Sequence, residues 1–467
     1  MRTHKAEFVK PRLIAWAFIC MVGFFLLTLP VIADDLVLLI QFTVNTNDKN
    51  LLQSFVFEVN HQWTNSDNRF LPIGWIISAL LLTISKALKL TGFIDLELSW
   101  SLVRLSFIAI TAWISWRNIS LIQKFHGLWR LSFTKYLIIL CLTLQMHALW
   151  GHDPIISYTS TVFGLVIWTT LYFRFLETKF GLFGGISRIL VLLCLITIHE
   201  LSIAVLGYLI TLAAMEKFRK NSLLRIIPDL VIILCYLLFV ITASVTEKSS
   251  YSGTQIGSIF LIPLYSIVQI AGTLPLSTWP LYIYSIFTEN FEITSLVLGI
   301  SLAIPVLLLS KLKLVLPEKV MQPREYHFAI SILAFLLLLA IGTAMSEKYQ
   351  TAYLLVPGNT YFIYVFGWIL FPFFVSLFSR IRFGKAHGLI CLVFLLNSFI
   401  LGSSIHSINV KFEVNSKILK QFEVIKAESN CDFLKFLNVA GYPDYYYLII
   451  RDALLVQQPA FKRCKNE

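Results

Sequence analysis

Charged residues are scarce in this chain. Asp, Glu, Lys and Arg make up 14% of its 467 residues, whereas hydrophobic residues make up 57%. Soluble globular domains carry about 25% charged residues, so the shortage excludes an ordinary water-soluble globule. The apolar residues form continuous runs rather than short alternating segments, which favours membrane-spanning helices over a membrane barrel.

Several motifs of familiar chemistry are also missing. There is no CxxC pair, no zinc-ligand spacing and no Walker loop, and "GLFGG" at 181–185 follows no predicted strand, so it is no nucleotide cradle. The lack of evident internal repeats weakens an inverted-repeat transporter. Of the seven cysteines, only Cys431 and Cys464 lie outside apolar segments. In an oxidising compartment these two would form a disulfide; two free thiols are the alternative.

What the chain does have is a series of apolar stretches separated by basic clusters. The stretches are 13–33, 72–92, 99–116, 136–150, 155–173, 187–215, 226–243, 257–288, 293–310, 327–344, 361–379 and 387–404. The basic clusters between them hold 22 of the 38 Lys and Arg residues, and the positive-inside rule places those clusters in the cytoplasm. The formal charge of +12 thus reports membrane topology and does not indicate nucleic-acid binding.

This pattern predicts an all-α polytopic membrane protein with about 11–13 transmembrane helices. We expect residues 1–404 to form the membrane-embedded domain and 405–467 an external C-terminal tail. Residues 34–98 form the first external loop, in which 72–92 lies along the interface because its Ser78, Ser85 and Lys89 share one helical face. The stretch 187–215 has basic ends, which predicts a hairpin of two short helices; one oblique helix is the alternative. For 257–288, a hairpin and an interfacial segment both remain open.

Two adjacent carboxylates, Asp34 and Asp35, end the first apolar run. The run from Leu13 to Ala33 has 21 residues, long enough at 1.5 Å per residue to cross the roughly 30 Å hydrocarbon core of a bilayer. A secretory signal peptide cleaved after Ala33 is the alternative, although its apolar region is usually about 7–15 residues long. The prediction is a retained first helix with both carboxylates at its outer rim.

Four stretches on the predicted outer side together resemble the GT-C superfamily of integral-membrane glycosyltransferases. They are "ADDLVLL", "NRFLPIGWIISALL", "HDPIISY" and "SEKYQTAYLLVPGNTYFIY". The resemblance covers roughly residues 1–220 in architecture and is greatest to bacterial enzymes that use polyprenyl-phosphate sugars, such as serotype-converting O-antigen glucosyltransferases. The chain has "NRF" where "GR" is common and lacks a DxD motif. Both departures leave the acceptor class and the use of a divalent cation open.

The resemblance implies an inverting glycosyltransferase in the bacterial inner membrane, with its N terminus cytoplasmic and its C terminus periplasmic. The donor is a polyprenyl-phosphate sugar, and the acceptor is a surface glycan or lipopolysaccharide such as O-antigen. Asp34 or Asp35 is the candidate catalytic base, since a positioned carboxylate that takes the hydroxyl proton contributes about 10²–10⁴-fold in rate. Repulsion between the two makes one of them a better base near neutral pH.

Other ionisable and aromatic residues on the outer side are candidates for substrate binding, each with a structural alternative. They are Arg69, Arg104, His152, Asp153, His199, Glu200, Lys348, Tyr349 and Tyr353. A cation stabilises a departing phosphate, and Arg69 suits that role as a planar fork. Arg104 lies inside an apolar helix, where it binds a carboxylate such as Asp34 or Asp153, or else extends outward to the interface.

The alternatives for the remaining candidates are local. Asp153 caps the helix that begins at Pro154. His199 and Glu200 form a pair at the hairpin apex, and Lys348 pairs with Glu347. The tyrosines belong to the interfacial aromatic belt.

Two other functions compete with glycosyl transfer. A lipid-linked sugar flippase or other transporter would line a path across the bilayer with charged residues. An O-antigen polymerase or ligase would carry several arginines in its late external loops, whereas residues 244–360 contribute only Lys248 and Lys348 on that side.

Overall fold

The computed structural model describes residues 33–64, 71–126, 181–198, 203–215, 220–246, 256–272 and 323–347, together with isolated positions elsewhere. Within these residues every regular secondary-structure element is a helix and no strand is present, which confirms the all-helical expectation. A single antiparallel bridge joins Ile256 to Ser346.

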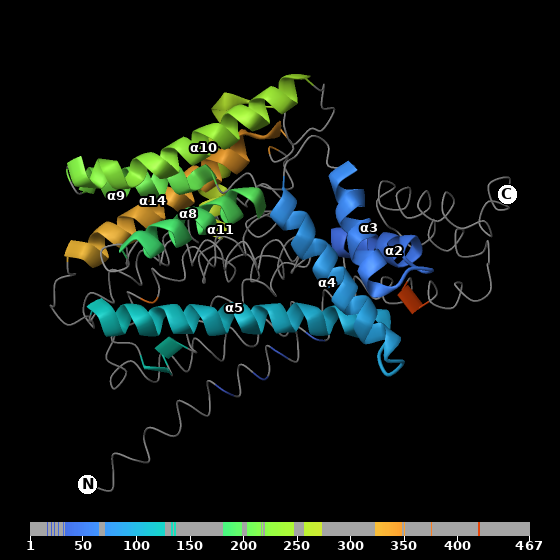
Figure 1. The fold of residues 1–467 in the computed structure, drawn as a ribbon. Coiled ribbons are helices and arrows are strands. Elements are labelled where there is room, and N and C mark those ends of the chain that lie inside the picture. The colour runs from blue at the N-terminus through green and yellow to red at the C-terminus, as the bar shows by residue number, and fades with distance from the viewer. Residues whose placement is uncertain are drawn as a thin grey trace, which may run out of the picture.

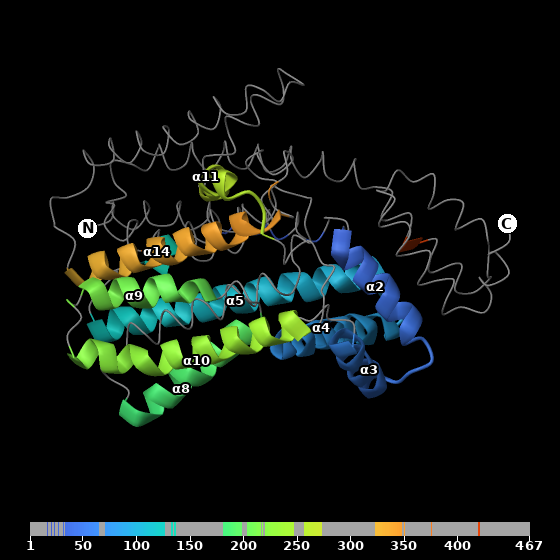
Figure 2. The same ribbon diagram turned by 90° about the horizontal axis from the view of Figure 1, so that it is seen from above.

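The helices that form the body of the described structure run in roughly one direction (Figures 1 and 2). They are α5 (Leu96–His126), α8 (Gly181–Ile198), α9 (Val205–Met215), α10 (Lys220–Thr246) and α14 (Pro323–Met345). The helix α11 (Ile262–Gly272), which follows the one-turn helix η4 (Ile259–Leu261), packs against α14. The core between α9 and α14 is apolar, with Tyr208, Phe335 and Leu339 almost fully buried.

The first external loop of the sequence prediction is largely helical. It contains α2 (Ala33–Asn45), α3 (Leu51–Thr64) and α4 (Pro72–Leu90). Asn50 and Gln53 cap the start of α3 by reciprocal hydrogen bonds. The backbone N–H of Gln53 donates to Asn50 Oδ1 over 2.9 Å, and the backbone N–H of Asn50 donates to Gln53 Oε1 over 3.1 Å. Figure 1 shows the three helices gathered at the end of α5 where that helix begins.

The polar face of α4 does not lie where the sequence pattern suggested. Ser78 and Ser85 are fully buried: Ser78 accepts a bond from Gln62 of α3, and the Ser85 hydroxyl lies 2.7 Å from that of Ser99 on α5. The exposed stripe of α4 is instead apolar, formed by Ile76, Leu80 and Ile84. The serines therefore mark helix packing, and the face that they share is no reason to place α4 along the membrane interface.

By length and composition alone, α4 is also the one helix in the described part of the chain that could cross a membrane. Shorter apolar helical stretches cover Ile189–Ile198, Val205–Met215, Ile226–Phe239 and Ile330–Met345.

The stretch 187–215 contains two helices, which confirms the predicted division; the predicted hairpin apex at His199 and Glu200 lies outside the described residues. α8 ends at Ile198 and α9 begins at Val205; both pack against α10, but α8 also packs on α4 and α9 on α14. Glycines permit both of these further contacts. A Cβ on Gly74 would lie 2.9 Å from the Ile198 carbonyl oxygen, and a Cβ on Gly207 would lie 2.7 Å from that of Ala334.

Candidate functional site

The first turn of α2 holds the acidic pair of the sequence analysis. Val31 is not helical and α2 begins at Ala33, so the two aspartates occupy the start of a new helix rather than the end of the first one. The N-terminus of a helix carries partial positive charge and favours carboxylates. The local fold therefore supplies an electrostatic reason for acidic residues at these two positions.

Asp35 is enclosed by α5. Its side chain is 3% exposed, and its Oδ2 accepts a hydrogen bond of 3.2 Å from the indole Nε1 of Trp100. Trp100 itself is 2% exposed. A carboxylate removed from water in this way needs partners that offset the lost hydration.

Arg104 supplies the opposite charge. It lies one turn after Trp100 on α5, is 5% exposed, and donates from Nη2 to the Ser101 hydroxyl over 3.3 Å. The carboxylates of Asp35 and Glu97 both interact electrostatically with its guanidinium, and Asp35 contributes the larger share. Asp35 is thus the carboxylate of the acidic pair whose interaction with Arg104 the structure describes; the side chains of Asp34 and Asp153, which the sequence suggested, lie outside the described part. Extension of Arg104 to an exposed interface is excluded by its burial.

The structure leaves most other candidates undescribed. The backbone of Asp34 belongs to α2, but its side chain is outside the described part. The other candidates lie wholly outside the described residues: Arg69, His152, Asp153, His199, Glu200, Lys348, Tyr349 and Tyr353. Cys431 and Cys464 lie outside them too. Asp35 and Arg104 are therefore the two predicted site residues that the described structure brings together.

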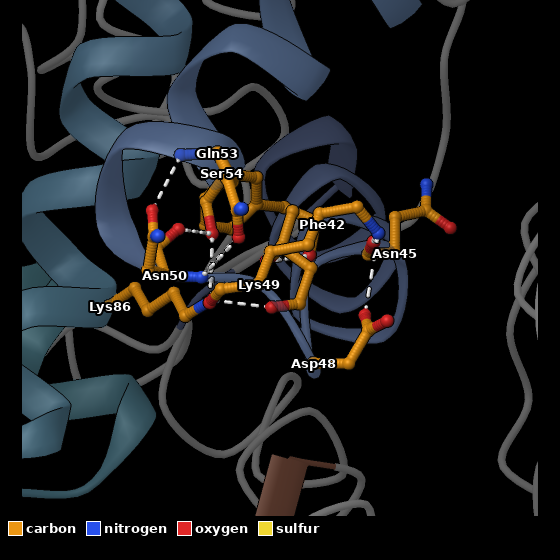
Figure 3. Close-up of polar contacts among 9 residues, drawn as sticks. Phe42, Asn45, Asp48, Lys49, Asn50, Gln53, Ser54 and Lys86 are labelled. Carbon is orange, nitrogen blue, oxygen red and sulfur yellow. Dashed lines mark hydrogen bonds and ion pairs between the residues drawn. The ribbon is translucent and has the colours of Figure 1, made fainter.

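Lys86 of α4 makes a second polar centre that sequence reasoning missed (Figure 3). Its ammonium donates to the carbonyl oxygens of Thr46 and Lys49, the latter over 2.8 Å, and to the Ser54 hydroxyl over 2.7 Å. These acceptors lie between the end of α2 and the first turn of α3. A cation is favoured at a helix C-terminus, so Lys86 ties α4 to both preceding helices.

Glu58 forms a third polar centre at the interface of α3 and α4. It is 3% exposed and accepts a bond of 2.8 Å from Gln62 Nε2, which also donates to Ser78 over 2.9 Å. Burial raises the pKa of Glu58 above its ordinary value, against the smaller opposing effects of Gln62 and His61. The spacing of Ser54, Glu58 and Gln62 at i, i+4 and i+8 was the available sequence signal for this polar face.

Within the described residues, no group of three or more His, Cys, Asp or Glu side chains is placed to hold a metal ion. The use of a divalent cation stays open, as it was from the sequence.

The chain matches no protein-family model, no curated protein and no solved structure in the comparisons made with each. The resemblance to GT-C glycosyltransferases therefore rests on the quoted sequence stretches alone.

Proposed function

We propose that the protein is an inverting membrane glycosyltransferase that moves a sugar from a polyprenyl-phosphate donor to a surface glycan or lipid acceptor, such as O-antigen. The observation that carries the proposal is the buried contact of Asp35 with Trp100 and its interaction with Arg104. This contact holds Asp35, at the start of α2, against α5, the helix that contains the apolar stretch 99–116. Ionisable groups at the edge of apolar helices are costly, and they usually serve function.

The reaction follows from carboxylate chemistry. A carboxylate of the Asp34–Asp35 pair takes the proton of an acceptor hydroxyl, whose oxygen attacks the anomeric carbon of the donor sugar. The bond from that carbon to the phosphate oxygen breaks, and polyprenyl phosphate leaves with the electron pair. A single displacement inverts the anomeric configuration. Arg69 is our proposed cation for the leaving phosphate, because a guanidinium binds phosphate as a fork.

The proposed location is the bacterial inner membrane, with the acidic pair on the outer face. The basic clusters at the cytoplasmic ends of the apolar stretches support this orientation. It requires residues 405–467 to be outside as well. A C-terminal reporter that is active only in the cytoplasm should therefore be inactive; activity of that reporter would contradict the orientation.

Sugar transfer in membranes tests the proposal directly. Membranes that contain the full chain are supplied with radiolabelled polyprenyl-phosphate glucose and lipopolysaccharide acceptor. Wild-type protein should transfer label, whereas Asp34→Asn with Asp35→Asn should abolish transfer at matched expression. Asp48→Asn is the control, since Asp48 is an exposed acid in the turn that follows α2. Full activity of the double variant would show that neither aspartate of the pair is the catalytic base.

One observation favours transport as a second candidate. Asp229 in α10 is fully buried and follows Pro228, which lies inside the helix. A buried ionisable residue beside a proline within an apolar helix is typical of transporters for ions or charged substrates. Movement of labelled polyprenyl-phosphate sugar across vesicles without any acceptor, lost in Asp229→Asn, would favour the transporter over the transferase.

A further inference from the structure

We infer that the two aspartates have different roles and that Arg104 is a positioning residue: Arg104 and Trp100 hold Asp35 in place, and Asp34 takes the acceptor proton. This inference rests on the proposed glycosyl transfer. It assigns roles that the sequence leaves undivided.

The enclosure of Asp35 is the first step. A general base must come within about 2.6–3.2 Å of the proton donor's oxygen, directly or through one water molecule. Asp35 is 3% exposed, and one of its oxygens is already bonded to Trp100. The surfaces around it belong to the protein, so a sugar hydroxyl has little access to this carboxylate. Within the pair, this leaves Asp34 for proton transfer.

The placement of Arg104 is the second step. Trp100 and Arg104 are four residues apart and so share one face of α5, the face that meets the first turn of α2. Arg104 is 5% exposed, so its guanidinium does not extend to water but lies within the fold, where the charge of Asp35 acts on it. An opposite charge at close range stabilises an ionised carboxylate, and removal of one member of a buried pair leaves the other charge buried without its partner.

Charge bookkeeping around Asp34 supplies the test. We take Arg104 and Asp35 as ionised, with opposite charges that offset each other at the proposed base, the sequence neighbour of Asp35; Glu97, which also acts on Arg104, is unchanged in every variant. Arg104→Gln leaves a negative charge next to that base, so the acid limb of the kcat/KM profile should move to higher pH by about one unit. Asp35→Asn leaves a positive charge, so the limb should move to lower pH by a similar amount. The double variant should return the limb close to its wild-type position.

The experiment measures kcat and KM against pH for the full chain in membranes, with labelled polyprenyl-phosphate glucose as the donor. We expect Asp34→Asn to lower kcat by at least about 100-fold, whereas Arg104→Lys keeps the charge and restores most of the activity lost in Arg104→Gln. Arg117→Gln is the matched control, because Arg117 is an exposed arginine on the same helix. Trp100→Phe keeps an aromatic ring but removes the indole donor and part of the ring volume, and it should lower kcat/KM about fivefold. Thermal unfolding of each variant identifies any that fails to fold, and Arg104→Lys and Trp100→Phe then carry the test.

The outcomes separate the two claims. Opposite shifts of the acid limb in Arg104→Gln and Asp35→Asn support the division of roles. If the wild type transfers sugar but neither variant shifts the acid limb of its pH profile, the division of roles is overturned and the proposed transferase activity stands. Full activity of Asp34→Asn has the same meaning. A folded wild type that transfers no sugar overturns the proposed function and the assigned roles together.

Discussion

Replacement of Lys86 by Met should open the junction of α2, α3 and α4. Methionine keeps a long unbranched stem but removes the ammonium that bonds to the Thr46 carbonyl, the Lys49 carbonyl and the Ser54 hydroxyl. Thr46 and Ser54 are fully buried and Lys49 is half-buried, so the three acceptors regain only some hydration after the change. At about 1 kcal/mol for each lost bond, the local free energy of opening falls by about 3 kcal/mol, which corresponds to roughly 100-fold faster exchange.

Amide hydrogen exchange of residues 46–54 in the detergent-solubilised chain measures this opening. Six backbone amides in the stretch are internally bonded and report it, those of Thr46, Asn47, Lys49, Asn50, Gln53 and Ser54. Lys124→Met removes a lysine that is exposed on α5 and serves as the control. Exchange in Lys86→Met within about threefold of wild type, in a folded protein, would refute the reasoning that this ammonium holds the three helices together.

Three further predictions concern single positions. Because burial raises the pKa of Glu58 from 4.5, its favourable contribution is fully present below about pH 4.5 and is lost as pH rises through the raised value. Glu58→Gln should therefore have a higher Tm than wild type at pH 8 and an equal Tm at pH 4; a constant difference would contradict this account. Gly207→Ala places a Cβ 2.7 Å from the Ala334 carbonyl oxygen and should lower the stability of the α9–α14 pair by about 1–3 kcal/mol. Gly23→Ala, with nothing within 4 Å of the new Cβ, should not lower the Tm, and equal losses in both would exclude the close approach as the cause. Asn50→Ala removes the cap of α3 and should cost about 1 kcal/mol, measured as faster exchange of the first amides of that helix; unchanged exchange would show that the cap is dispensable.

The helices were largely predictable because apolar runs of sufficient length have few other solutions. The interruption of 187–215 was predictable too, since both of its ends are basic. The burial of Ser78 and Ser85 was not. Periodicity shows that two residues share a helical face, but it does not show whether that face meets water or another helix.

The candidate site could be predicted only in part, for a similar reason. An acidic pair and an arginine inside an apolar run are visible in the sequence, yet the interaction of Asp35 with Arg104 depends on how α2 meets α5. Lys86 was missed because its main partners are backbone carbonyl oxygens, which every residue has. Side-chain identity carries no record of which carbonyls a helix end presents.

The polar contacts among the helices from α2 to α5 also have a consequence for folding during synthesis. Gln62 and Ser78 are 16 residues apart, Ser85 and Ser99 are 14 apart, and the most distant pair, Asp35 and Trp100, spans 65 residues. All of them lie within the first 104 residues, so every partner has been translated before α8 begins at Gly181. The chain can therefore complete this cluster while its later helices are still being made, when unpaired buried charges would otherwise be most exposed to misfolding.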